Sequence, residues 1–506
     1  MWSSVPDDSV CDVNPVSILR GGRRARRTGA PGPHTNSAST PAAVGSEPVP
    51  LASGPGELWR AQVQRPDLAL WVAHCVEIRC AEMGGVEIGG AAGVGSGSGA
   101  RLDVDRLRAA SRCATAELGT GLVRFVVVDG LPHQLFDPTL DVEPDYLDLR
   151  DEVSPRAAAE AWMRAELTGP VDFGNDRLAR IAVLQIGDAH HLWFSRAHRT
   201  VLDGFGAVTL LARAAELYDA ATGGGAARPN RALAPSAIDD LDRGYAASQR
   251  RRTDAAYWAE RLAGAPAYTG LAGEVAPGFG PGELAPADGP RRGDLTVDAV
   301  LPGGSDLLVA AERRYGLGSA ALAASALAAY LARVTGRTDL VLDLPVPARM
   351  GAGLRYSGGS RENTVPLRLH APVDATVGEL LADAHQALVG AVQHQQFRVA
   401  AGDGPVAHGP LLQVALSPRE IRLTGLDVEI RDLSTSPVVD LRVELAECPD
   451  GIVRLGFTAN PYRYDEGTLA RHHRRFLWLF TRLLEAAPSD LIGELRTEPK
   501  VPLRVV

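Results

Sequence analysis

The sequence predicts an α+β fold arranged as two lobes of comparable size, on three observations. The chain has 506 residues, which is enough for two or more hydrophobic cores of ordinary domain size. Helical and strand-like segments are mixed in both halves, without the strict alternation of a doubly wound sheet. A stretch rich in glycine and proline, residues 222–235, separates the halves. We therefore expect a disordered tail over residues 1–50, a first lobe over 51–225 and a second lobe over 226–500.

The elements of the first lobe follow from hydrophobic periodicity and turn residues. Residues 102–116 place Leu102, Leu107 and Ala110 at helical spacing. Residues 122–128 read as a strand and stop at Asp129-Gly130, a turn signal. In chain order we expect a helix over 57–63, a strand over 70–78, a helix over 102–116, a strand over 122–128, a helix over 155–167, strands over 178–184 and 191–198, and a helix over 207–221.

The second lobe is predicted in the same way, with a loop rich in glycine and proline over residues 264–293. Short apolar runs predict buried strands, and longer periodic segments predict helices. In chain order we expect a helix over 238–262, a strand over 295–301, helices over 306–315 and 320–334, strands over 340–344 and 365–369, a helix over 377–393, strands over 411–416, 428–433, 439–447 and 453–459, and a helix over 465–485.

Composition excludes several classes of function. The net charge is −9 and no segment forms a basic domain, so we expect no nucleic-acid partner. No run of 18 apolar residues occurs, so we expect no membrane span. The five cysteines form no C-x-x-C pair, and we expect reduced thiols in a cytoplasmic, monomeric protein. Neither a nucleotide-binding glycine loop nor a metal-ligand cluster is found, so we expect no nucleotide and no metal.

The segment most indicative of function is His198-Arg-Thr-Val-Leu-Asp203-Gly204, which follows an apolar run and precedes a helical one. It resembles the His-His-x-x-x-Asp-Gly signature of the condensation domains of nonribosomal peptide synthetases. Further segments match motifs of that family in order and spacing, and the subgroup they most resemble is the actinobacterial one at the start of siderophore-type synthetases. These segments are Leu51 to Trp59, Tyr257-Trp258, Leu344-Pro-Val-Pro-Ala-Arg349, Glu362-Asn-Thr-Val-Pro-Leu-Arg368, Ser436-Pro-Val-Val-Asp440 and Ala459-Asn-Pro461.

The resemblance implies two chloramphenicol-acetyltransferase-like lobes in a V-shaped pseudo-dimer, with a tunnel between them. It implies that an acyl or aminoacyl thioester arrives at one end, on the phosphopantetheine arm of a partner carrier protein. An amine, or a hydroxyl, supplied at the other end would then be acylated. No intrinsic cofactor is implied.

One signature position departs from the family, because Arg199 replaces the second His, to which the family assigns the acyl-transfer chemistry. An arginine stays protonated and cannot act as a general base. Arg199 can instead donate hydrogen bonds to a developing oxyanion, or it can fill the tunnel and stop transfer. His198 matches the first His, which is mainly structural in the family, although it can also have become the base by default.

The resemblance assigns further roles by position. Asp203 forms a buried ion pair with Arg349, and Gly204 provides close backbone approach or a positive φ, with an amide that can face the substrate. Asn363 and Ser436 match tunnel-lining positions, where either substrate contact or structural hydrogen bonding is expected.

Two functions therefore stay open on the sequence. The first is an acyltransferase that joins a carrier-bound thioester to an amine. The second is a catalytically inactive condensation-like module that recruits a tailoring enzyme or a carrier protein, as the His-Arg-x-x-x-Asp-Gly domain of glycopeptide synthetases does. Cyclisation or epimerisation in the same cleft is a weaker alternative, because an epimerase is expected to keep the second His.

Overall fold

A computed structural model gives the structure of the chain. The residues it describes are 47–80, 101–137, 140, 143–223, 225–266, 268–274, 293–351, 353–399, 408–415, 421–436, 438–448 and 451–497. Most of the predicted tail, residues 1–46, lies outside these ranges. Val49–Pro50, predicted as part of that tail, instead form a strand paired with Gln134 and His133. Two residues are too few to leave a periodic pattern in the sequence.

Each helix and strand predicted for the first half is present, with ends shifted by a few residues. The sequence missed β4, which contains Pro132, and the short strand β5. The elements are β1 (Val49–Pro50), α1 (Ser53–Gln64), β2 (Trp71–Arg79), α2 (Val104–Leu118), β3 (Val123–Val128), β4 (Leu131–Phe136), β5 (Asp145–Asp148), α3 (Pro155–Glu166), β6 (Ala179–Gly187), β7 (His190–His198) and α4 (Gly204–Gly223).

The second half also contains its predicted helices and strands, with one exception. The helix expected over 238–262 is two helices, because Ser248 ends the first and caps the second by accepting a hydrogen bond from Arg251 N. The elements are α5 (Pro235–Ala247), α6 (Gln249–Arg261), β8 (Thr269–Gly270), β9 (Gly273–Glu274), β10 (Leu295–Val300), α7 (Gly304–Tyr315), α8 (Ser319–Thr335), β11 (Asp339–Val346), η2 (Leu354–Tyr356), β12 (Asn363–His370), α9 (Val377–Gln393), β13 (Leu411–Ala415), β14 (Asp427–Asp432), β15 (Leu441–Glu447), β16 (Val453–Ala459), α10 (Glu466–Glu485) and η3 (Ile492–Glu494).

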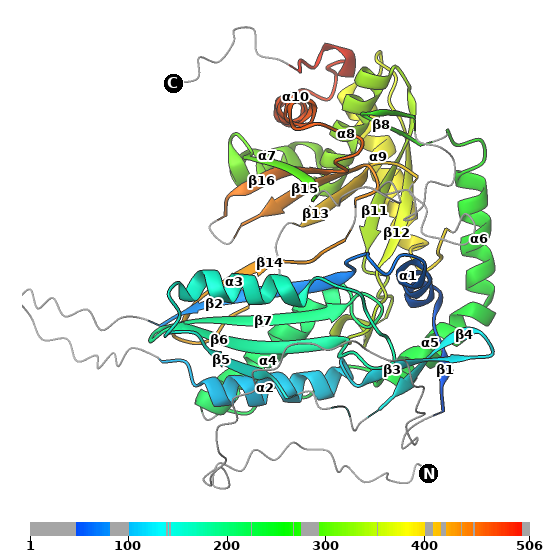
Figure 1. The fold of residues 1–506 in the computed structure, drawn as a ribbon. Coiled ribbons are helices and arrows are strands. Elements are labelled where there is room, and N and C mark those ends of the chain that lie inside the picture. The colour runs from blue at the N-terminus through cyan, green and yellow to red at the C-terminus, as the bar shows by residue number, and fades with distance from the viewer. Residues whose placement is uncertain are drawn as a thin grey trace, which may run out of the picture.

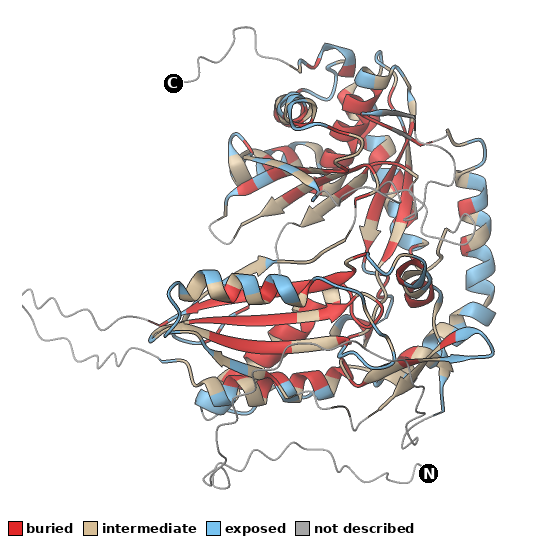
Figure 2. Ribbon diagram, in the orientation of Figure 1, coloured by how far each residue is buried: buried red, intermediate tan, exposed pale blue. Residues whose placement is uncertain are grey.

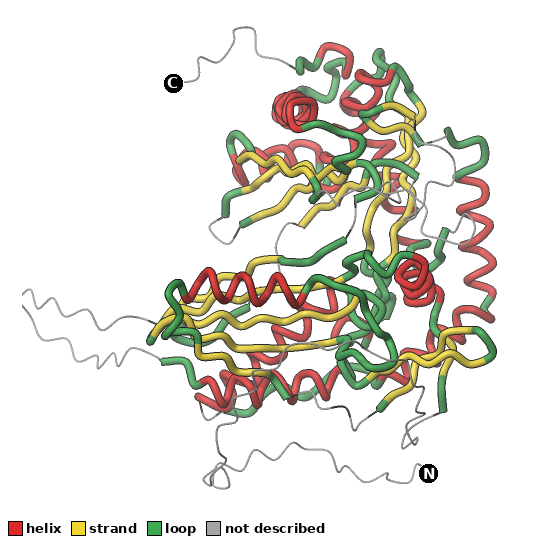
Figure 3. The backbone as a smooth tube through the Cα atoms, in the orientation of Figure 1, coloured by secondary structure: helices red, strands yellow, loops and turns green. Residues whose placement is uncertain are grey.

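The predicted α+β class is confirmed, since each half builds a mixed sheet with helices packed on it (Figures 1 and 3). The first sheet has the order β14-β2-β7-β6-β5, with α2 and α4 on one face and α3 on the other. Its outer strand β14 comes from the second half of the chain and pairs antiparallel with β2. Residues 427–432 therefore cross from the predicted second lobe into the sheet of the first.

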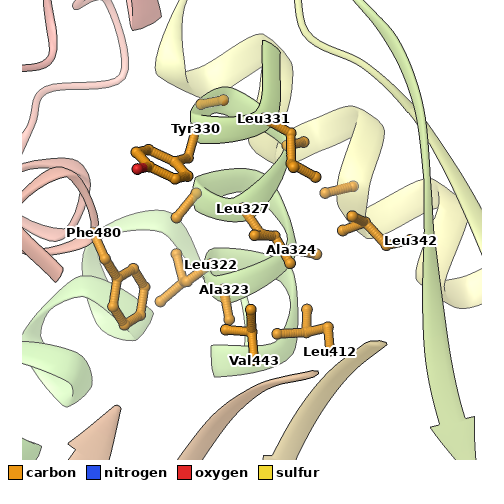
Figure 4. Packing of buried hydrophobic residues seen from close by; sticks show 14 of the residues in the cluster. Leu322, Ala323, Ala324, Leu327, Tyr330, Leu331, Leu342, Leu412, Val443 and Phe480 are labelled. Atoms are coloured by element: carbon orange, nitrogen blue, oxygen red, sulfur yellow. The ribbon is translucent and has the colours of Figure 1, made fainter. Parts of the chain in front are cut away.

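The second sheet has the order β10-β16-β15-β13-β11-β12 and carries the larger core. Helix α8 lies at the centre of that core and is buried along most of its length, as the red segments of Figure 2 show. In Figure 4, Leu322, Leu327 and Tyr330 of this helix pack among side chains from the strands below and from α10. This apolar packing gives the second half a rigid platform for the loops that reach toward the first.

Helices α5 and α6 run along one side of the molecule (Figure 1), and α5 contacts both halves. Asp239 of α5 accepts a hydrogen bond from Gln134 of β4, while Asp242 pairs with Arg361 of the second half. Among the described residues no single helix is long and apolar enough to cross a bilayer. The bent pair α7–α8 meets that test only jointly, and α8 is a core helix.

Candidate active site

The signature segment connects the end of β7 to the start of α4. The Arg199 N–H donates to Leu70 O at 2.8 Å and so continues the pairing of β7 with β2. From the second half, Thr435 N donates to Trp71 O at 2.8 Å. Two segments of the second half lie against the signature: the crossover segment 433–435, where Thr435 O accepts from Arg199 Nε at 3.3 Å, and the loop 358–362, where Gly359 O accepts from Asp203 N at 3.3 Å.

His198 is fully buried, and both of its ring nitrogens are occupied. Nδ1 lies 2.8 Å from Thr200 Oγ1 and accepts the Thr200 N–H, so Nε2 carries the proton and donates to Gln62 Oε1 at 3.1 Å. Trp71 and Phe173 hold the ring edge-on at centroid distances of 5.3 and 5.1 Å. Burial, with Arg196 and Arg199 nearby, lowers the pKa of His198 to about 3. The ring is neutral and inaccessible, which suits a structural role rather than that of a base.

Asp203 is the most heavily bonded side chain of the signature. Arg349 donates two hydrogen bonds to its carboxylate, from Nη1 to Oδ2 at 2.6 Å and from Nη2 to Oδ1 at 2.9 Å. The backbone N–H groups of Gly206, Arg361 and Glu362 donate to the same carboxylate. Both ion-pair partners are buried, with 3% and 2% of their side chains exposed. The pair joins the two halves and leaves the carboxylate no free face for chemistry.

Glycine is required at position 206 rather than at 204. Gly204 has no positive φ, and the nearest described atom that a Cβ there would meet is Glu362 Oε2, at an ordinary 3.8 Å. The positive φ expected at Gly204 is therefore wrong, whereas close approach of its backbone to a substrate stays a prediction. A Cβ at Gly206 would lie 2.6 Å from Leu202 Cδ1 and 3.3 Å from Arg349 Nη2. This glycine lets α4 begin directly against the buried ion pair.

Arg199 points from the first half toward the second. Its Nε donates to Thr435 O at 3.3 Å, and its Nη1 lies 3.9 Å from Glu362 Oε1. The Arg199 side chain is 18% exposed and that of Glu362 is 38% exposed. Residues of both halves flank this looser pair, yet solvent reaches it.

The two tunnel positions predicted by resemblance have different surroundings. Asn363 is 4% exposed, and its Nδ2 donates to Gln395 O at 2.8 Å and to Phe397 O at 2.9 Å. Its amide therefore anchors β12 to the chain that follows α9. Ser436 is half-buried at the end of the crossover segment, next to Thr435 and thus close to Arg199 along the chain.

Three residues that shape the site carried no predicted role: Gln62, Gly206 and Glu362. Gln62 is buried and bonds His198. Glu362 is part of a recognised motif segment, but only the three-dimensional contact with Asp203 brings it to the signature. Gly206 could have been noticed in the sequence, since it is a second glycine two residues after Gly204.

Comparison with known proteins decides the family. A sequence model of the condensation domain matches residues 100–497, which is most of the chain. The chain belongs to the condensation-domain family. This family works in nonribosomal peptide synthesis and catalyses amide-bond formation, so the predicted family is confirmed.

Relatives and solved structures of condensation domains agree with this assignment. The isonitrile lipopeptide synthase of Streptomyces coeruleorubidus is 31% identical over 75% of this chain and 26% of its own length. Enterobactin synthase component F of Escherichia coli K12 is 27% identical over 89% of this chain and 33% of its own length. The chain thus spans about a quarter to a third of these synthetases.

Among solved structures, the starter condensation domain of rhizomide synthetase matches with a TM-score of 0.71 and 25% identity, over 90% of this chain and 100% of that one. The first condensation domain of the calcium-dependent antibiotic synthetase matches with a TM-score of 0.73 and 24% identity, over 89% of this chain and 99% of that one. The chloramphenicol-acetyltransferase-like fold that the sequence predicted is therefore confirmed.

Condensation domains act on substrates carried by phosphopantetheine arms, so carrier proteins are the partners that the family context implies. Among the described residues there is no group of three or more His, Cys, Asp or Glu side chains placed to hold a metal ion.

Proposed function

We propose that this chain is an amide-forming acyltransferase of nonribosomal peptide synthesis, similar to starter condensation domains. It would join an acyl or aminoacyl thioester on a carrier protein to an amine acceptor. The observation that carries the proposal is the intact brace between Asp203 and Arg349, which fixes the signature against the second half. Two halves that are fixed against each other in this way can hold two substrates in a constant relative position.

Positioning of the two substrates can by itself supply much of the rate enhancement. Holding a thioester and an amine in reacting geometry can contribute about 7–11 kcal/mol to lowering the barrier. Arg199 adds a fixed positive charge beside the signature, with Nε held by Thr435 O. In this role its outer nitrogens donate to the oxyanion that develops on the thioester carbonyl.

The comparisons suggest the substrate class. A variant of the rhizomide starter domain was solved in complex with C8-CoA and Leu-SNAC, which are an acyl thioester and an aminoacyl thioester. By analogy, a medium-length acyl thioester as donor and an aminoacyl thioester as acceptor are the first substrates to test here. The phosphopantetheine arm of the carrier would deliver each.

A second function has one observation in its favour. Arg199 reaches from the first half to Thr435 and Glu362 of the second, a position from which a long cation would obstruct the tunnel that the resemblance implies. On this alternative the chain is an inactive module that recruits a tailoring enzyme or a carrier protein. The alternative predicts that shortening Arg199 does not reduce any product.

Intact-protein mass spectrometry separates the two functions. Carrier-bound acyl thioesters of several chain lengths are mixed with aminoacyl thioesters and with the native chain, Arg199→Ala or Arg199→His. The acyltransferase predicts amide product from the native chain and a loss of product with Arg199→Ala. Product from Arg199→His alone contradicts the proposal and favours the recruiting module.

A further inference from the structure

Amide formation from a thioester releases one proton from the attacking amine, and that proton needs an acceptor. Arg199 occupies the position that the family gives to histidine, but an arginine is already protonated. On the proposed acyltransferase function, the proton acceptor is therefore a group other than Arg199, and the side chains close to the signature are the candidates.

Three titratable side chains near Arg199 are unsuited to the task. His198 has both ring nitrogens bonded and is fully buried. Asp203 accepts hydrogen bonds from Arg349 and from three backbone N–H groups. His74 is 6% exposed, and its Nδ1, which has no hydrogen-bond partner among the described residues, is shielded from solvent. A substrate amine cannot reach any of these atoms.

Glu362 differs from all three because its carboxylate is accessible while its backbone is fixed. Its N–H donates to Asp203 Oδ2 at 2.8 Å, and its carbonyl accepts from Arg398 Nη2 at 2.5 Å. These bonds hold residue 362 on the loop that faces the signature. The side chain keeps 38% of its surface exposed.

The two carboxylate oxygens face different surroundings. Oε1 lies 3.9 Å from Arg199 Nη1. Oε2 lies 3.8 Å from the position that a Cβ on Gly204 would occupy, and the glycine leaves that space empty. One oxygen thus lies within ion-pair distance of the arginine, and the other faces the space that the missing side chain of Gly204 leaves at the start of α4.

We infer that Glu362 is the catalytic residue that accepts the proton of the attacking amine, in place of the histidine that Arg199 has replaced. The nitrogen forms its bond to the thioester carbonyl carbon, and the N–H proton passes to Glu362 Oε2. The C–S bond then breaks, the proton passes from Glu362 to the leaving sulfur, and the products are the amide and the free thiol. Arg199 stabilises the oxyanion and keeps its charge throughout.

The electrostatic surroundings suit this role. Glu362 lies between the two halves, where its carboxyl is partly removed from water, and this raises its pKa above the ordinary carboxyl value. Asp203 acts in the same direction and the nearby arginines oppose it. A carboxylate with a raised pKa is a stronger base near neutral pH. The charged groups that face Glu362 are Arg199 after β7, Asp203 before α4, Arg349 after β11 and Arg398 after α9.

The test compares Glu362→Gln with Glu57→Gln in single-turnover amide formation on acylated carrier protein. Glu57 is the matched control, because it is a carboxylate near Arg398 that is 20% exposed and has no contact with the signature in the described structure. Glu362→Gln is expected to lower the rate about 10²- to 10⁴-fold, the range of a lost general base. Glu57→Gln is expected to stay within about threefold of the native chain, since it removes no base.

The outcomes separate the inference from the function beneath it. An active native chain with an unchanged rate for Glu362→Gln overturns the inference and leaves the acyltransferase standing. A native chain that makes no amide overturns the acyltransferase, and the inference with it.

A second measurement covers the case in which Glu362→Gln fails to fold. The native rate is followed against pH with an acceptor amine that is uncharged across the range. The rate is expected to rise through one group whose pKa lies above the ordinary carboxyl value, because only the ionised carboxylate accepts a proton. A rate that does not change with pH overturns the inference.

Discussion

The two ends of the signature loop differ in how deeply their charged side chains are buried and in how closely those charges are paired. At Asp203 the charge is buried and saturated, since Arg349 and three backbone N–H groups bond the carboxylate. At Arg199 the charge is partly exposed, and its partner Glu362 lies at the longer distance of 3.9 Å. The first arrangement fixes the two halves against each other. The second leaves polar atoms available, which is the condition for acting on a substrate.

This difference explains why a substitution at position 199 is expected to be tolerated by the fold, whereas a substitution at Asp203 is not. Loss of one partner from a saturated buried pair leaves an uncompensated charge. Replacement at a solvent-accessible position leaves the fold intact and alters only what the site can do. The predictions below test that contrast, from the largest expected effect to the smallest.

Asp203→Ala is expected to cost about 3–5 kcal/mol in the free energy of unfolding, because it leaves Arg349 buried without its partner. Asp298→Ala, which breaks the exposed pair with Arg454, is the matched control and is expected to cost at most about 1 kcal/mol. Urea unfolding of both variants measures the difference. Equal losses in the two variants would contradict the structural role given to the buried pair.

Gly206→Ala is expected to destabilise the protein by about 1–3 kcal/mol, since the new methyl group would lie 2.6 Å from Leu202 Cδ1. Gly204→Ala places its methyl 3.8 Å from Glu362 Oε2 and is expected to leave stability unchanged or slightly higher. Thermal unfolding of the two variants side by side checks this. A larger loss at position 204 would show that the space beside Glu362 is not open.

His198→Gln tests the neutral, structural histidine. The folded pKa of about 3 lies below the unfolded value, so the unfolded state takes up the proton first and stability falls as pH drops below about 6.5. Between pH 6 and pH 5 this one group is expected to remove about 1 kcal/mol from the native chain. The variant should lose that much less over the same interval, as measured by unfolding at each pH. Parallel curves for the two proteins would contradict a buried neutral ring.

Much of the fold could be predicted from the sequence because its long elements are strongly periodic. The helix expected over 377–393 has the same ends in the structure, where Thr376 and Glu379 form a capping box. The segment 238–262 was harder, since Ser248 can sit inside a helix or cap one, and only the packed structure shows that it caps. Short strands such as β5 depend on tertiary pairing and left no pattern of their own.

The candidate site likewise contains residues that the sequence could reveal and residues that only the folded structure brings together. His198, Arg199 and Asp203 are contiguous in sequence, so their motif could be recognised directly. The part played by Glu362 could not, because its N–H meets Asp203 across 159 residues of chain. The low exposure of Asn363 likewise depends on Gln395 and Phe397, which approach only when α9 packs on β12.

The most direct test of the central claim is a double-mutant cycle on the single-turnover rate of amide formation. It uses the native chain, Arg199→Ala, Glu362→Gln and the double variant. If the two side chains act as one unit, the double variant should be within about threefold of the slower single variant, because either change alone disables the step. Independent effects that multiply in the double variant would contradict the claim that Arg199 and Glu362 together replace the missing histidine.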